Sequence, residues 1–115
     1  MDADIRFYRD QSHQPRVQGY PGHQALANCL ESDLQDSATI SAVLAALEQV
    51  TTGKDQELYG NSYTVTMRPD EVTLESLFDD SERPTRLPAQ PFKSLLTAWL
   101  DFLDNENLIS IVPNF

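Results

Sequence analysis

The sequence has few of the residues that make covalent cross-links, phosphate-binding loops or membrane spans. Its single cysteine, Cys29, excludes an intrachain disulfide and a multi-cysteine metal cluster, and is compatible with a reducing cytosol. The four glycines form neither a glycine-rich phosphate loop nor a Gly-x-Ser-x-Gly motif. The longest apolar runs are too short to span a bilayer, and no signal segment is recognisable at the amino terminus. We therefore expect a cytoplasmic protein.

Basic residues are scarce as well. Eight Lys and Arg stand against 18 Asp and Glu, which gives a formal net charge of -10. A field of this sign repels nucleic acid and anionic membranes, so we expect neither as a ligand, and it favours a basic protein partner. An acidic surface that serves only solubility would give the same balance. Hydrophobic residues make up 40% of the chain, enough for one core, so residues 1–115 are predicted to form a single domain.

The residues that most often carry chemistry are isolated from one another. His13 and His23 are ten residues apart, and neither has a Cys or a second His at ligand spacing, so we expect no metal site and no cofactor. Cys29 is flanked by the acids Glu31 and Asp33 rather than by a Lys or Arg that would activate it, which favours a buried apolar role. A protein without enzymatic activity is predicted. The alternative is a small hydrolase that uses Cys29, or a pair of carboxylates.

Residues 60–78 are typical of a β-hairpin. Tyr63, Val65 and Met67 alternate with two threonines, residues 68–71 form a proline-containing turn, and residues 72–77 alternate again. Further short strands are predicted at residues 4–8, 16–20 and 83–87. Residues 54–58 are predicted to be a polar loop, and residues 108–115 either a last edge strand or a free end.

Two segments have the periodicity of amphipathic helices. The first begins after the candidate N-cap Ser37, and the second begins near Pro91. The apolar stripe of the first helix is Ile40, Val43, Leu44, Leu47 and Val50, and that of the second is Phe92, Leu95, Leu96, Trp99, Leu100 and Leu103. Residues 23–34 are ambiguous, because leucines recur every four residues and small apolar residues every two; a strand through Leu30 is slightly favoured over a helix. The predicted fold is α+β, a single antiparallel sheet of about four to six strands with two helices packed on it.

Four stretches resemble a known family. They are residues 29–35, 60–66 and 72–80, and Leu87-Pro88 followed by the aromatic helix around Trp99. Together they are similar to CdiI-type immunity proteins of contact-dependent growth inhibition and, more loosely, to small YacL-like proteins. The resemblance covers residues 31–103. It implies a protein that binds the C-terminal domain of a cognate toxin, usually a nuclease, and blocks its active site or substrate groove. The alternative is a cytosolic interaction protein of the YacL-like type that has no toxin partner.

Such a partner would need a basic groove for phosphates, which an acidic surface can occupy. The densest acidic cluster of the chain is Asp79, Asp80 and Glu82, in a predicted hairpin loop. A second cluster is Glu31, Asp33 and Asp36. These six acids are the predicted partner-binding residues, although the first cluster would equally suit a solvated loop.

Overall fold

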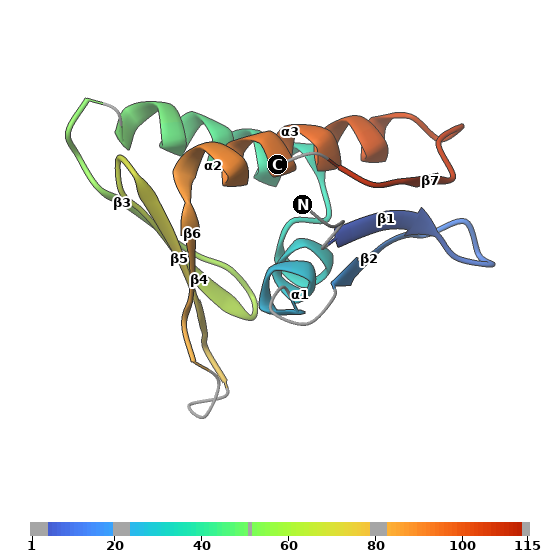
Figure 1. Cartoon of the computed structure of the whole chain (residues 1–115), viewed down its shortest axis with the longest axis horizontal. Coiled ribbons are helices and arrows are strands. Elements are labelled where there is room, and N and C mark those ends of the chain that lie inside the picture. The colour runs from blue at the N-terminus through green and yellow to red at the C-terminus, as the bar shows by residue number, and fades with distance from the viewer. Residues whose placement is uncertain (1–4, 20–23, 51, 79–82, 114–115) are drawn as a thin grey trace.

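The computed structural model describes residues 5–19, 24–50, 52–78 and 83–113 (Figure 1). In this part of the chain it has an α+β fold with two antiparallel sheets, of three and four strands, and three helices. The predicted class is therefore confirmed, whereas the prediction of one sheet and two helices is wrong. None of the described helices is both long and apolar enough to cross a membrane.

The smaller sheet joins the two ends of the chain. Strands β1 (Ile5–Arg9) and β2 (Pro15–Gly19) form a hairpin, and β7 (Ser110–Ile111) pairs with the free edge of β1, giving the order β2-β1-β7. The pairing of Phe7 with Ile111 makes the tail an edge strand, which was one of the two predicted outcomes. Ile5, Phe7 and Val17 are buried on one face, as the two-residue alternation requires.

The larger sheet is built on the predicted hairpin. Strands β4 (Tyr63–Met67) and β5 (Glu71–Ser76) pair in register, with β6 (Thr85–Pro88) on one side and β3 (Gln56–Tyr59) on the other. The prediction of a polar loop at 54–58 is wrong. A strand forms there because β4 supplies the hydrogen-bond partners, while only Gln56 and Leu58 need to point inward.

Residues 24–33 form helix α1 (Gln24–Asp33), so of the two alternatives left open the helix is correct and the slightly favoured strand is wrong. Its buried side chains are Leu26, Ala27, Cys29 and Leu30, which lie on one face of a helix and would lie on both faces of a strand. Figure 1 shows α1 lying between the two sheets, and it packs on β2 and contacts β5. The apolar face of α1 thus fills the space between two sheets, a position that the predicted one-sheet fold does not contain.

Helices α2 (Ser37–Val50) and α3 (Ala89–Asp104) pack on each other and lie above the larger sheet in Figure 1. Both predicted stripes are confirmed. Phe102 is also fully buried on α3, and the prediction of the second stripe did not include it. The N-cap of α2 is Asp36 rather than Ser37, because the Asp36 carboxylate accepts the Thr39 N–H at 2.6 Å. The turn after α2 is completed by Gly53 at a φ of 103°, a conformation that favours glycine.

An aromatic cluster joins α3 to the smaller sheet and to α1. The rings of Phe7 and Trp99 lie 4.8 Å apart between centroids, and Phe102 lies within 6.0 Å of both. The buried Trp99 Nε1 donates to the Leu34 carbonyl at 2.7 Å, just after the end of α1. This bond satisfies two polar groups that burial would otherwise leave unpaired.

Arg9 satisfies the carbonyl groups at the end of α3. Its Nε donates to Leu108 O at 2.9 Å, and its Nη2 donates to Phe102 O at 2.8 Å and Asn105 O at 3.3 Å. Its Nη1 donates to His13 O at 3.4 Å, and the guanidinium lies 4.9 Å from the centroid of the Phe102 ring. One side chain thereby holds α3, the tail and the β1–β2 turn together.

Replacing Arg9 should therefore destabilise the fold. We expect Arg9→Met to lower the free energy of unfolding by about 2 to 3 kcal/mol, because several charge-assisted hydrogen bonds to carbonyls are lost. Arg9→Lys should lose most of the same stability, since an ammonium group lacks the planar fork. Urea denaturation measures both, with Arg86→Met on exposed β6 as the matched control. A loss for Arg9→Met no larger than for Arg86→Met would contradict this role.

Candidate functional site

The first predicted acidic cluster, Asp79, Asp80 and Glu82, lies outside the described residues. The two residues just before it are described and are unusual for their exposure: 40% of Leu77 and 79% of Phe78 are accessible. In Figure 1 the far end of β5 extends away from α2 and α3. Two exposed apolar side chains therefore precede the predicted acids at an outlying point of the fold.

Glu31, in the second predicted cluster, holds β2 against α1. Its carboxylate accepts the Val17 N–H at 2.6 Å and forms an ion pair with Arg16 at 3.2 Å. The Val17 N–H lies on the outer edge of β2, so Glu31 occupies a donor that another strand could otherwise use.

Asp33 anchors the turn between β3 and β4. Its carboxylate accepts the N–H groups of Ser62 at 3.0 Å and Tyr63 at 2.9 Å. Gly60 is required beside it, because a Cβ at that position would overlap the Asp33 side chain. Asp36, the third member of the cluster, caps α2, and the Thr39 N–H lowers the pKa of its carboxyl. These three acids are close together in the sequence, but each carboxylate is bonded to a partner within the protein.

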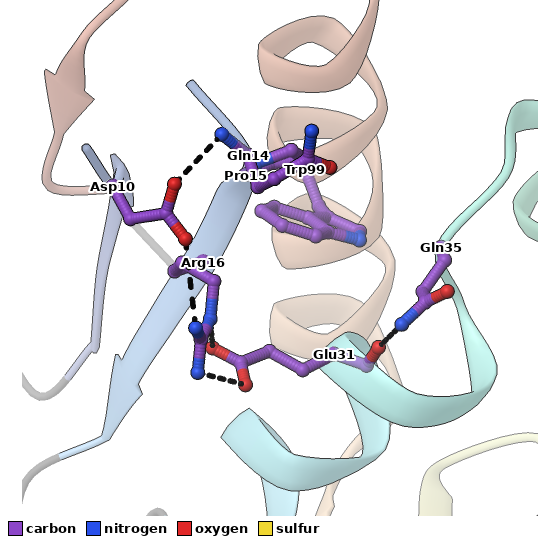
Figure 2. Close-up of a pocket in the computed structure, with 7 residues that line it drawn as sticks. All are labelled: Asp10, Gln14, Pro15, Arg16, Glu31, Gln35 and Trp99. Carbon is purple, nitrogen blue, oxygen red and sulfur yellow. Dashed lines mark hydrogen bonds and ion pairs between the residues drawn. The ribbon is translucent and has the colours of Figure 1, made fainter. Parts of the chain in front are cut away.

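A polar cavity of about 440 Å³ opens beside this cluster (Figure 2). It is lined by Asp10, Gln14, Pro15, Arg16, Glu31, Gln35 and Trp99. Figure 2 shows Arg16 between two carboxylates, Asp10 at 3.6 Å and Glu31. The hydrogen bond and charge of Glu31 raise the pKa of Arg16, and the Gln14 N–H is the main cause of the lowered pKa of Asp10. The arginine of the cavity is thus paired with both carboxylates, and none of the described residues that line it carries a hydroxyl or thiol.

Two of the side chains considered for catalysis or metal binding, Cys29 and His13, are described, and they lie in different surroundings. Cys29 is fully buried, and burial, followed by the charge of Asp33, raises the pKa of its thiol to about 12. A thiol with this pKa stays protonated near neutral pH, which is the opposite of an activated nucleophile. His13 is exposed in the β1–β2 turn, with its Nε2 at 3.1 Å from Glu106 O, and His23 lies outside the described residues. Within the described ranges, no three His, Cys, Asp or Glu residues are grouped as metal ligands.

A further surface was not identified from the sequence: the face of the larger sheet opposite its buried apolar side chains. We call it the outer sheet face. The register places Tyr59, Thr64 and Glu75 in one row, and Glu57, Thr66, Thr73 and Arg86 in another. The opposite face carries Val65, Met67, Val72 and Leu74, which are buried. Tyr59 is 72% exposed, and it donates its hydroxyl to Glu57 at 2.6 Å, which raises its pKa. The alternation of polar Glu57, apolar Leu58 and Tyr59 could have indicated this strand, but residues 54–58 were predicted to be a loop.

Comparison with known proteins identifies one family. Residues 1–85 match the family model described as Uncharacterised protein family (UPF0231). No curated protein and no solved structure matches the chain.

The bonded Asp33 and the exposed Asp101 should differ in their contribution to stability. Asp33→Ala should lower the free energy of unfolding by about 2 to 3 kcal/mol, because it leaves two partly buried N–H groups without their charged acceptor. The matched control is Asp101→Ala, on the exposed face of α3, which should change stability by less than about 0.5 kcal/mol. Equal effects in urea denaturation would show that the Asp33 bonds do not hold the turn.

The cap of α2 should contribute a pH-dependent part of stability. Because the pKa of Asp36 is lowered in the folded protein, its contribution is present above the ordinary value of 3.8 and is lost as pH falls through the lowered pKa. Asp36→Asn keeps a capping oxygen but does not titrate. Wild type should therefore lose more stability than Asp36→Asn between about pH 4 and about pH 2. Parallel stability curves in urea titrations across this range would contradict the assignment.

Proposed function

The chain belongs to UPF0231, a family of uncharacterised proteins, and we propose that it is a binding protein that docks its acidic surface on a basic partner. The more specific form of the proposal is an immunity protein, which neutralises the toxin domain of a cognate toxin by covering its active site or substrate groove. The observation that carries the proposal is the exposure of Phe78, 79% accessible and directly followed in the chain by Asp79 and Asp80.

Exposed apolar side chains gather at this end of the larger sheet. The Leu77 N–H donates to Ser62 O at 2.9 Å, so pairing of β4 with β5 continues beyond Ser76. Tyr59 lies in the row of Glu75, two residues before Leu77. Aromatic residues inside a polar and charged rim are typical of binding hot spots, where a partner covers the apolar group and excludes water.

The charge that remains available on the surface supports a basic partner. The side-chain carboxylates of six described acids make no hydrogen bond or ion pair: Asp70, Glu71, Glu75, Asp101, Asp104 and Glu106. Together with the net charge of -10, they would attract a basic protein over a long range and speed its association. A nuclease has such a basic surface, because it must hold phosphates.

Capture from cells of the source organism tests the proposal. We expect the tagged wild-type protein to retain one basic protein at near equal amounts, identified by quantitative mass spectrometry. Phe78→Ala and the pair Asp79→Lys with Asp80→Lys should each reduce this recovery by about tenfold or more, as expected for hot-spot residues. Ile109→Ala is the matched control, since Ile109 is another exposed apolar side chain, near β7. This variant should retain as much of the partner as wild type does. Equal recovery by every variant, or no enriched basic protein, would refute the proposal.

The identity of the partner separates the immunity function from an interaction protein without a toxin. Expression of the captured protein alone should arrest growth, and co-expression of the wild-type chain should restore it. Co-expression of Phe78→Ala should restore growth less well. A captured partner that is harmless when expressed alone would favour the alternative, an interaction protein of the cytosol.

A further inference from the structure

The free edge of the larger sheet is β3. Gly60 N–H donates to Tyr63 O at 2.8 Å, so the alternation of an antiparallel ladder directs the backbone groups of Gln56, Leu58 and Gly60 toward β4. The N–H and C=O groups of Glu57 and Tyr59 then point away from the sheet. No strand in the described part of the chain pairs with this edge. Two residues therefore present four backbone groups that another extended segment could bond.

An apolar cavity of about 350 Å³ lies beside this edge, between β3 and α2. Its floor is formed by buried Leu34, Val43 and Val65. Helix α2 contributes Ala38 and Ala42, which are one turn apart and exposed. Because both side chains are single methyl groups, the helix leaves a hollow along the edge of the sheet rather than closing against it.

The charge around the groove is of one sign. Among the described residues that line it, Asp33 is the only charged one, and none is a Lys or Arg. On the other side of the β3 edge, Glu57 and the exposed Tyr59 lie together on the outer sheet face. A cationic side chain that reached this face could pair with the Glu57 carboxylate and stack on the Tyr59 ring.

From these three features we infer that the β3 edge and the groove beside it bind an extended basic segment of the partner as an added strand. Side chains of a strand alternate between faces, so the residue beside Leu58 enters the apolar groove and its two neighbours meet Glu57 and Tyr59 outside. The segment recognised thus has an apolar residue between two basic ones. This inference rests on the proposed function, because it names the part of the basic partner that binds.

A second copy of the chain fits this edge less well. Two β3 strands paired across a two-fold axis would bring together two chains that each carry a charge of -10. A basic segment instead compensates the acidic surroundings of the edge, and the groove admits its apolar side chain.

The test uses a fluorescein-labelled hexapeptide of alternating arginine and valine, titrated into the full-length protein. Binding is followed by fluorescence anisotropy and by the backbone amide resonances in NMR. We expect the largest chemical-shift changes at the amides of Glu57 and Tyr59. The peptide should bind Ala42→Phe about tenfold more weakly, because the phenyl ring fills the groove. Ala45→Phe is the matched control: Ala45 is an exposed alanine of α2 that does not line the groove, so the affinity should be unchanged.

Several results would overturn the inference. These are undiminished binding to Ala42→Phe, shifts centred away from β3, equal binding of a glutamate–valine hexapeptide, or a dimer of the free protein that the peptide dissociates. Ala38→Phe blocks the same groove from the next turn of α2, and it replaces Ala42→Phe if the latter does not give the far-ultraviolet circular dichroism of the folded protein.

Capture of the partner by the same variants separates this inference from the proposed function. If Ala42→Phe still retains the basic partner and Phe78→Ala does not, the proposed function stands and the groove has no part in it. If the peptide binds as expected but no basic protein is captured, the groove is confirmed as a peptide site and the proposed function fails.

Discussion

The arrangement of the two sheets depends on the last residue of α1 and the residue that follows it. The Asp33 carboxylate binds the turn between β3 and β4, and the Leu34 carbonyl accepts the indole N–H of Trp99 on α3. Two successive residues thus tie α1 to the larger sheet and to the helix that packs against both sheets. The same residues line the groove beside β3, so the geometry of that groove follows from bonds made within the core.

This dependence divides the acids of the chain into two groups. Asp10, Glu31, Asp33 and Asp36 bind backbone amides or Arg16, and their charges maintain the fold. Others, such as Glu75 and Asp101, make no such bond and are free to act over a distance. Net charge alone therefore overstates how much of the surface is available to a basic partner. In the proposed function, that charge acts beside the exposed apolar residues at one end of the larger sheet.

The sequence predicted those elements in which the spacing of apolar residues follows the one face that is buried. The hairpin of β4 and β5 and the stripes of α2 and α3 each bury one face, so alternation or three- and four-residue spacing is visible locally. Helix α1 and strand β3 could not be predicted in this way. The spacing of small residues in α1 also fits a strand, and β3 is a strand only because β4 lies beside it. The surface at Tyr59 was missed for the same reason, whereas Asp79, Asp80 and Glu82 were found as a cluster in the sequence without reference to the fold.

By itself, the sequence determined the α+β class, the acidic charge, the isolation of Cys29 and the two long amphipathic helices, because composition and short-range spacing contain this information. The tertiary structure alone decided that the tail pairs with β1, that α1 lies between two sheets, and that Glu31 and Asp33 are bonded within the protein. Each of these depends on contacts between residues distant in the chain, as when Asp33 binds Tyr63 or Arg9 binds Leu108. Such contacts are set by packing and by the pairing of buried polar groups, which no local pattern of residues specifies.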